Sequence, residues 1–460
     1  MPRFRLQPRP GTGRIGLHIS LLAGLLAGVL AGCARYTPLP LATTPPLTPE
    51  VSALPGAPAP HEPLSVAQVV DLALANNPEL KAARLRRAVA AGQTKQAGIL
   101  PNPSLGGSIL PLLSGVGTVT AWNISLSQDI RSIITYSSRH RAARDSEQQV
   151  AADIVWQEWL VAGRARQLAT DLIIGARSRP LYGAARQLLA DRNAKLDQAL
   201  AAGNTTLTIV APDRVALQAA RMALDSFDQT QLALKHQLNA LLGLAPDADV
   251  PLVATPDLPA FDPAAIRASL PSLADRRPDL IALRLGYGAA DETVHQAILA
   301  QFPDLVLGPS ASSDNSKVIN AGPNATLGLP VFDRNQGALA IARATRAQLH
   351  AEYAARLAAT TGEVGALLGQ AEQLSAQLDR ARRALPGARL AAERAAAAFG
   401  ASNLDERGYV DLVSSHFARE QEIMTLELAL LDRQIAIQTL VGAGLPTVDL
   451  PRAPSGSMQR

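Results

Sequence analysis

The stretch NNPEL at residues 76–80 returns as RRPDL at residues 276–280, and this echo decides how the chain is divided. A helical-looking run follows each copy and ends in a related pattern, QAGILPNPSLGGS at 96–108 and QAILAQFPDLVLG at 296–308. The offset is 200 residues in both cases, without a gap. Self-similarity at a fixed distance indicates a duplicated structural unit.

The first 33 residues have the layout of an export signal. Residues 1–32 contain four arginines and no acidic residue, and an apolar run spans 15–31. That run is shorter than the ~20 residues of a membrane-spanning helix, so the pattern favours a secretory signal peptide at 1–32. Cys33, the only cysteine, follows Leu-Ala-Gly, which resembles the lipobox of bacterial lipoproteins. The resemblance implies a covalent lipid on Cys33 and, because Ala34 follows, transfer to the outer membrane; an ordinary signal peptide with a stray cysteine is the alternative.

The charge balance bears on possible partners. The chain has 43 Lys and Arg against 39 Asp and Glu, but removal of the four signal arginines makes the two totals equal. The basic pI therefore gives no support to nucleic acid as a partner. With one cysteine no internal disulfide is available, so packing or assembly must hold the exported chain together.

Proline-rich segments separate the repeats from the rest of the chain. Nine prolines in 35–63 favour an extended tether over 33–63 that carries the lipid. A second proline-rich stretch, 245–271, is the predicted linker between the repeats. The tail at 444–460 is predicted to be disordered.

Each repeat, at 64–244 and 272–443, reads as helix, two strands, very long helix, turn and helix. In the first repeat Ser65 is the expected N-cap of a helix that runs towards Gly98, with a break at Asn77-Pro78. Alternation of apolar with small or polar residues predicts strands at 120–128 and 324–331. The earlier strand of each hairpin is expected near 104–112 and 304–312, so that the two hairpins fall within 103–130 and 303–332.

Alanine-rich runs at 139–202 and 336–399 predict the long helices of two helical hairpins, at 136–243 and 336–441. At 1.5 Å per residue each run would reach ~95 Å, longer than a compact domain needs. Pro180 and Pro386 are expected to kink these helices. Gly203 and Gly400 are the expected left-handed stops, after which helices return at 212–242 and 409–441.

Strand counting limits how such a chain enters a membrane. Four short strands cannot close a transmembrane barrel, which takes at least about eight, and an open edge in lipid leaves backbone groups unpaired. If the strands enter a membrane, the chain must therefore oligomerise, and counting alone permits a dimer. The alternatives are surface hairpins on a helical protein and a coiled-coil scaffold without a pore.

The chain resembles the TolC-like outer-membrane efflux proteins over about 64–443. The resemblance rests on the signal with its cysteine, the paired repeats, the glycine turns and the stretches NNPEL, RRPDL, QAGILPNPSL and LPVFDRNQG (329–337). The resemblance implies a mainly α fold with a small β part. In it a homotrimer forms one twelve-stranded outer-membrane barrel, continued by a periplasmic helical tunnel. It also implies a passive channel for drugs, solvents or metal ions, which works with a periplasmic adaptor protein and an inner-membrane pump. A periplasmic adaptor lipoprotein and a non-transporting envelope scaffold are the rival functions.

The sequence offers no motif for catalysis, a cofactor or a metal. Its seven histidines are scattered, with no pair at zinc-ligand spacing. There is no GxSxG elbow and no GxxxxGK[ST] phosphate loop. We therefore expect no enzyme activity, no catalytic residue, no metal site and no cofactor besides the lipid.

The resemblance places the functional residues at the turns between the long helices. It implies that Asp411, with Arg407 and Asp405 nearby, lies at the periplasmic mouth of the tunnel. A second acidic position often found there is Ser414 in this chain, which weakens the case for a double acidic ring. Charges that only solvate an exposed turn are the alternative. The implied adaptor contacts are Gly203, Asn204, Thr205, Thr206, Leu207, Gly400, Ala401, Ser402, Asn403 and Leu404.

Overall fold

The computed structural model describes residues 36–59 and 62–449 of the chain. The chain forms two units, Met1–Pro46 and Leu47–Arg460. Of the first unit, residues 36–46 are exposed and contain no helix or strand. The predicted signal peptide at 1–32 and Cys33 lie outside the described residues.

The first repeat opens with two helices, α2 (Val66–Asn76) and α3 (Pro78–Ala97). Ser65 caps α2 in a reciprocal capping box with Gln68, as predicted. The predicted break at Asn77-Pro78 is also confirmed, and both residues of the pair contribute to it. The Asn77 side chain accepts from the backbone N–H of Leu80 and donates to the Leu241 carbonyl, at 2.9 Å each, while Pro78 occupies the first turn of α3.

The second repeat uses its copy of the motif differently. Helix α9 (Pro278–Leu299) again begins at the proline, but Arg277, at its N-cap position, makes no side-chain cap. Instead its guanidinium pairs with Asp279, with Nε 2.7 Å from Oδ1, and lies 4.6 Å from the centre of the Trp156 ring. The repeated motif therefore starts a helix in both copies, while its polar residues make different contacts.

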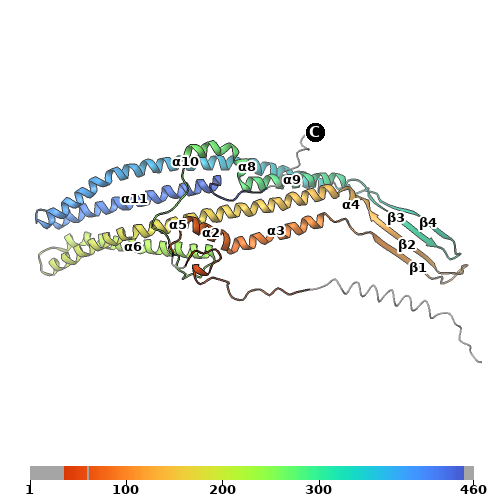
Figure 1. Cartoon of the computed structure of the whole chain (residues 1–460), viewed down its shortest axis with the longest axis horizontal. Coiled ribbons are helices and arrows are strands. Elements are labelled where there is room, and N and C mark those ends of the chain that lie inside the picture. Colours follow the sequence, from red (N-terminus) through yellow and green to blue (C-terminus); the bar gives the residue numbers. More distant parts are fainter. Residues whose placement is uncertain (1–35, 60–61, 450–460) are drawn as a thin grey trace, which may run out of the picture. The chain divides into compact units, whose positions relative to one another are not determined.

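The two β-hairpins join into one antiparallel sheet in the order β1-β2-β3-β4 (Figure 1). The strands are β1 (Ser104–Leu110), β2 (Ala121–Asp129), β3 (Asp304–Ser313) and β4 (Ile319–Gly328). Strand β2 of the first repeat pairs with β3 of the second. One sheet thus unites the repeats, and β1 and β4 form its two edges.

Strand β4 lies several residues earlier than the predicted 324–331. The Asp314 carboxylate accepts from the backbone N–H groups of Ser316 and Val318, at 2.8 and 3.0 Å. This tight turn starts β4 at Ile319 directly after it. The strand ends at Gly328 because its partner there, Asp304, is the first residue of β3.

Two helical hairpins form most of the Leu47–Arg460 unit. The first pairs α5 (Tyr136–Ala201), preceded by the short α4 (Ile130–Ile134), with α6 (Leu207–Leu242). The second pairs α10 (Gln336–Gly400) with α11 (Glu406–Val441). The partners of each hairpin lie side by side (Figure 1). Helices α5 and α10 continue through Pro180 and Pro386, respectively.

The two turns that close the helical hairpins differ in their left-handed residue. Gly203, with φ of 73°, lies just beyond α5 as predicted. The prediction for Gly400 is wrong, because Gly400 is the last residue of α10 and Ser402 takes the left-handed conformation with φ of 59°. The return helices also begin earlier than 212 and 409.

The segments predicted as tether, linker and tail contain residues that pack against the helices. In the tether, Thr48 forms a parallel bridge with Leu244, and Leu54 is 5% exposed. The linker at 245–271 contains α7 (Pro263–Ser269) and continues into a 3-10 turn, Leu270–Ser272, and α8 (Leu273–Arg276). In the predicted disordered tail, Pro446 accepts from Trp159 Nε1 at 2.7 Å. Buried leucines make these segments part of the fold, because leaving them in water would cost ~1.5–3 kcal/mol each.

The largest hydrophobic cluster lies where α2, α5 and α6 meet. Its members include Leu72, Trp159, Leu168, Leu238 and Leu242, each at most 2% exposed. A second cluster packs α8 against α10 and α11 through residues such as Leu273, Val364 and Ile437. Across the described part of the chain, we find no helix with the length and apolarity of a membrane span.

Candidate functional site

The predicted adaptor-contact residues lie at the turns between α5 and α6 and between α10 and α11. Most are exposed, although Thr205 and Leu404 are half-buried. Leu207 and Gly400 belong to helices rather than to the turns, as the first residue of α6 and the last of α10. The remaining predicted contact residues occupy the turns themselves.

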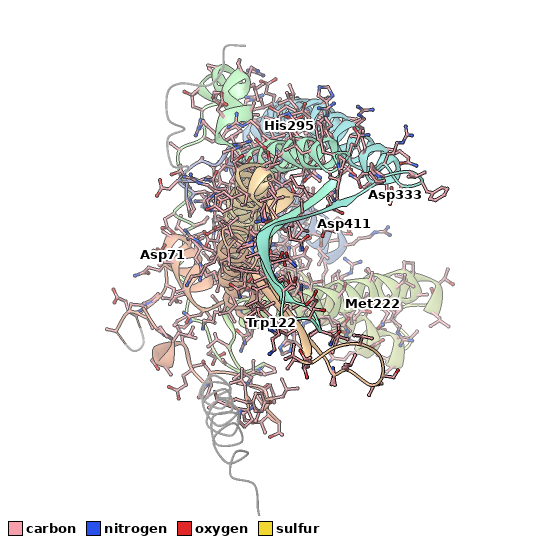
Figure 2. All side chains as sticks on the ribbon, turned by 90° about the vertical axis from the view of Figure 1, so that its right-hand side faces the viewer. Asp71, Trp122, Met222, His295, Asp333 and Asp411 are labelled. Carbon is pink, nitrogen blue, oxygen red and sulfur yellow. The ribbon has the colours of Figure 1, made fainter. Side chains whose placement is uncertain are left out.

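The three predicted gate residues lie on the first turns of α11. Asp405 is its N-cap, and the carboxylate accepts from the Gly408 backbone N–H at 3.0 Å. Arg407 Nε lies 3.8 Å from Asp411 Oδ2, with side chains 77% and 70% exposed. Figure 2 labels Asp411 on α11. Asp405 therefore caps α11, whereas Arg407 and Asp411 form a solvent-exposed pair.

Contacts near these turns join the two hairpins, and sequence reasoning missed them. Lys195 of α5 pairs with the Glu406 carboxylate of α11 at 3.0 Å. Arg192, with its side chain 6% exposed, pairs with Asp213 of α6 at 2.7 Å and donates to the Glu406 carbonyl at 3.3 Å. One buried arginine of α5 thus contacts both α6 and α11.

Aromatic packing supports the same junction. Phe399 stacks on Tyr409, with ring centres 4.9 Å apart, and Lys195 Nζ lies 5.5 Å from the centre of the Phe399 ring. The charged residues of α5 at this junction belong to no motif that would predict such contacts. Their partners on α11 are more than 200 residues away, so no local pattern connects them.

The strand register divides the sheet into two chemically different faces. Cross-strand partners point to the same side, and Leu105 lies opposite Leu126 while Ile109 lies opposite Trp122. The same face continues across β3 and β4 through Leu307, Pro309, Ala311, Ile319, Ala321, Pro323, Ala325 and Leu327. The opposite face is dominated by glycine and small polar residues, including Ser104, Ser108, Asn123, Ser125, Ser127, Ser310, Ser312, Asn320, Asn324 and Thr326.

The alternation predicted for 120–128 and 324–331 is confirmed as far as β2 and β4 extend. Residues 124, 126 and 327 share the apolar face, and 125, 127, 326 and 328 share the other. Leu329 lies beyond the end of β4 and is 72% exposed. Trp122, labelled in Figure 2, belongs to the apolar face. The sheet can therefore present one face to an apolar environment and the other to water.

A family model matches the second repeat, and a known protein is similar over most of the chain. Residues 270–443 match the family described as outer membrane efflux protein. The cation efflux system protein CusC of Escherichia coli O6:H1 is 24% identical over 404 residues, which cover 82% of this chain and 86% of CusC. The second repeat is therefore similar to the outer membrane efflux proteins, and most of the chain is similar to CusC.

Solved structures of similar proteins have the same fold. The Campylobacter jejuni CmeC outer membrane channel superposes with a TM-score of 0.68 at 16% identity, over 90% of this chain and 95% of CmeC. The open state of the Neisseria gonorrhoeae MtrE outer membrane channel gives a TM-score of 0.65 at 18% identity, over 90% of this chain and 98% of MtrE. The predicted fold class, mainly α with a small β part, is confirmed.

Among residues 36–59 and 62–449, no group of three or more His, Cys, Asp or Glu side chains is placed to hold a metal ion. The described site consists of charged turns at one end of the helical hairpins and a two-faced sheet joined to their other end.

Proposed function

We propose that this chain is the outer-membrane channel of a tripartite efflux pump and conducts small solutes passively from periplasm to exterior. The observation that carries the proposal is the sheet, with its apolar face, its polar face and two edges that no strand within residues 36–59 and 62–449 pairs. A single open sheet leaves edge N–H and C=O groups unsatisfied in lipid, so further copies must close it.

The proposed assembly is a homotrimer. Three copies supply twelve strands, an even number within the range of outer-membrane barrels, and edge β1 of one copy would pair with edge β4 of the next. The apolar face would contact lipid and the serine-rich face would line the water-filled pore. The helical hairpins would extend this pore into the periplasm.

The proposed partners are a periplasmic adaptor protein and an inner-membrane pump, which supplies the energy. The exposed turns around Gly203 and Ser402 are the proposed adaptor contacts, and Asp411 with Arg407 is the proposed gate. The printed name of CusC concerns cation efflux; for this chain the proposed cargo class comprises drugs, solvents or metal ions.

Lipid attachment at Cys33 would anchor the chain to the outer membrane. Cys33→Ser should abolish labelling by radioactive palmitate in cells, because it removes the only thiol of the chain. Channel assembly should survive, since a single lipid chain adds only reversible membrane binding and the strands make their own contact. Labelling that persists in Cys33→Ser would contradict acylation at this residue.

Oligomeric state and conductance test the channel itself. Light scattering of the purified protein in detergent should give three copies, and planar lipid bilayers should show single-channel conductance. A trimer without conductance would favour the scaffold. A monomer that binds an inner-membrane pump directly would favour the adaptor lipoprotein.

A further inference from the structure

A pair of carboxyl groups lies between the two repeats, away from the turns. Asp171 belongs to α5 and Asp432 to α11, and these helices pack against each other. The Arg177–Glu427 ion pair and the contact of Gly163 with Thr439 lie on either side of them along these helices, so Asp171 and Asp432 face each other. The two carboxyl groups lie within reach of a shared hydrogen bond. Two carboxylates have no hydrogen to share, so this contact needs one of them to be protonated.

Burial makes the protonated form favourable. Asp171 is 9% exposed, and Oδ1 of each aspartate is buried without a hydrogen-bond partner. Burial is the main cause that raises the pKa of Asp171 to about 7, followed by the charge of Asp432 and the hydrogen bond between them. Burial likewise raises the pKa of Asp432.

The surrounding charges do not neutralise the pair. Arg164 of α5 and Arg433 of α11 favour ionisation, but both are engaged elsewhere. Arg164 donates to Gln167 at 2.9 Å and also to Gln237 of α6, and Arg433 donates to Gln370 of α10 at 2.9 Å. Helices α6 and α10 thus approach these arginines through uncharged amides, and α2 meets α5 through the apolar core.

The fold does not require acids at these positions. Because α5 and α10 begin 200 residues apart, Asp171 corresponds to Ala371, which is 3% exposed in an apolar cluster. Counted from the starts of α11 and α6, Asp432 corresponds to Ala233. The corresponding position of the other repeat thus holds alanine in both cases, whereas the contact between the two repeats holds a pair of acids.

We propose that Asp171 and Asp432 hold one proton between them and so form an acid-stabilised link between α5 and α11. The proton neutralises one carboxyl group and provides the O–H that donates to the other. Its loss leaves two facing carboxylates, whose repulsion weakens the packing of the first repeat against the second. The link concerns helix packing and does not depend on the proposed channel function.

The sign of the pH dependence follows from the raised pKa. Between about pH 4, where an unfolded aspartate ionises, and about pH 7 the folded chain holds a proton that the unfolded chain has released. The link therefore contributes most in acid. Its contribution falls as pH rises through this window and stays constant above it.

Infrared titration of the full chain in detergent tests the shared proton. Near pH 6, about two units above an ordinary aspartate pKa, the wild type should retain the C=O band of a protonated carboxyl. Asp171→Asn and Asp432→Asn should each abolish the same one-proton band, because the asparagine amide donates to the remaining carboxylate and favours its ionised form. Asp225→Asn, at an exposed position of α6, is the matched control and should keep the band.

A second measurement follows the packing. The thermal midpoint of the wild type should fall between about pH 4 and pH 7, whereas Asp171→Asn should flatten this fall and raise the midpoint at pH 8. A band that survives in Asp432→Asn would mean that Asp171 is an isolated buried acid and would overturn the shared proton. If Asp171→Asn does not fold, a wild-type titration without the band near pH 6 would overturn the proposal by itself.

Discussion

Of the three predicted gate residues, Asp405 caps a helix and Arg407 is basic. Asp411 is therefore the acidic residue whose charge can act at the tunnel mouth. Three copies near a common axis would create a negative mouth that attracts cations. We expect Asp411→Asn to lower the cation preference of the channel, measured as reversal potential in bilayers under a salt gradient. The wild-type preference should itself weaken at high salt, because the Debye length shrinks to ~3 Å at 1 M.

Asp225→Asn is the control for this prediction, since it removes an exposed charge from α6 rather than from the turn. Equal reversal potentials for wild type and Asp411→Asn would identify Asp411 as a solvated turn residue.

Arg192 and Arg407 make ion pairs of very different burial near the same turns. Removing one partner of a buried pair costs about 3–5 kcal/mol, whereas an exposed pair is worth about 0–1 kcal/mol. We therefore expect Arg192→Ala, which orphans Asp213 and frees the Glu406 carbonyl, to lower the thermal midpoint strongly. Arg407→Ala should leave it nearly unchanged.

Channel recordings add a functional comparison between these two arginines. Both substitutions should increase open probability, and Arg192→Ala should do so more, because Arg192 ties α5 and α6 to α11. A larger effect of Arg407→Ala would place the control of opening in the exposed pair instead.

At the scale of the strands, the register predicts which face contacts lipid. Leu126 and Ser125 are neighbours on opposite faces of β2. An arginine on the lipid face at mid-bilayer depth costs about 2–4 kcal/mol, so Leu126→Arg should reduce the yield of assembled trimer more than Ser125→Arg. Native electrophoresis of detergent extracts measures this yield, and equal losses would argue against a membrane location of the sheet.

Two glycines on the same face of the sheet form a matched pair for testing how the repeats join. A Cβ at Gly308 of β3 would overlap the Leu126 carbonyl of β2, whereas a Cβ at Gly322 of β4 meets nothing within 4 Å. Gly308→Ala should therefore disrupt β2–β3 pairing and lower the trimer yield, while Gly322→Ala should be tolerated. Equal tolerance would mean that β2 and β3 do not approach as closely in the assembled protein.

At the scale of the whole molecule, the free edges of the sheet predict contacts between copies. Ile109 lies on edge strand β1, and Ile124 lies on central strand β2 with the same apolar face. A photo-reactive phenylalanine analogue at Ile109 should cross-link to a second copy in native membranes. At Ile124 it should react mainly with lipid. Cross-linking between copies from Ile124 alone would contradict closure through β1.

The local features of this chain were predictable from its sequence. The capped helix at Ser65, the alternating faces at 124–127 and the long helices each depend on residues close together along the chain, and the duplication is visible because such local patterns return 200 residues later. Helix and strand periodicities, caps and turns act over a few residues, so a linear pattern records them. The shift of β4 and the left-handed Ser402 show the limit, because each depends on how a turn closes.

The tertiary structure alone decided how the two repeats meet. The β2–β3 pairing, the contact of Arg192 with Glu406 and the Asp171–Asp432 pair join residues that are far apart in sequence, and the packed segments around Thr48 and Pro446 do the same. Such contacts depend on which buried surfaces and polar groups come together after the helices and strands have formed. The residues next to a charge or a proline in the sequence do not determine which distant residue it contacts. For this physical reason, sequence patterns did not reveal these contacts.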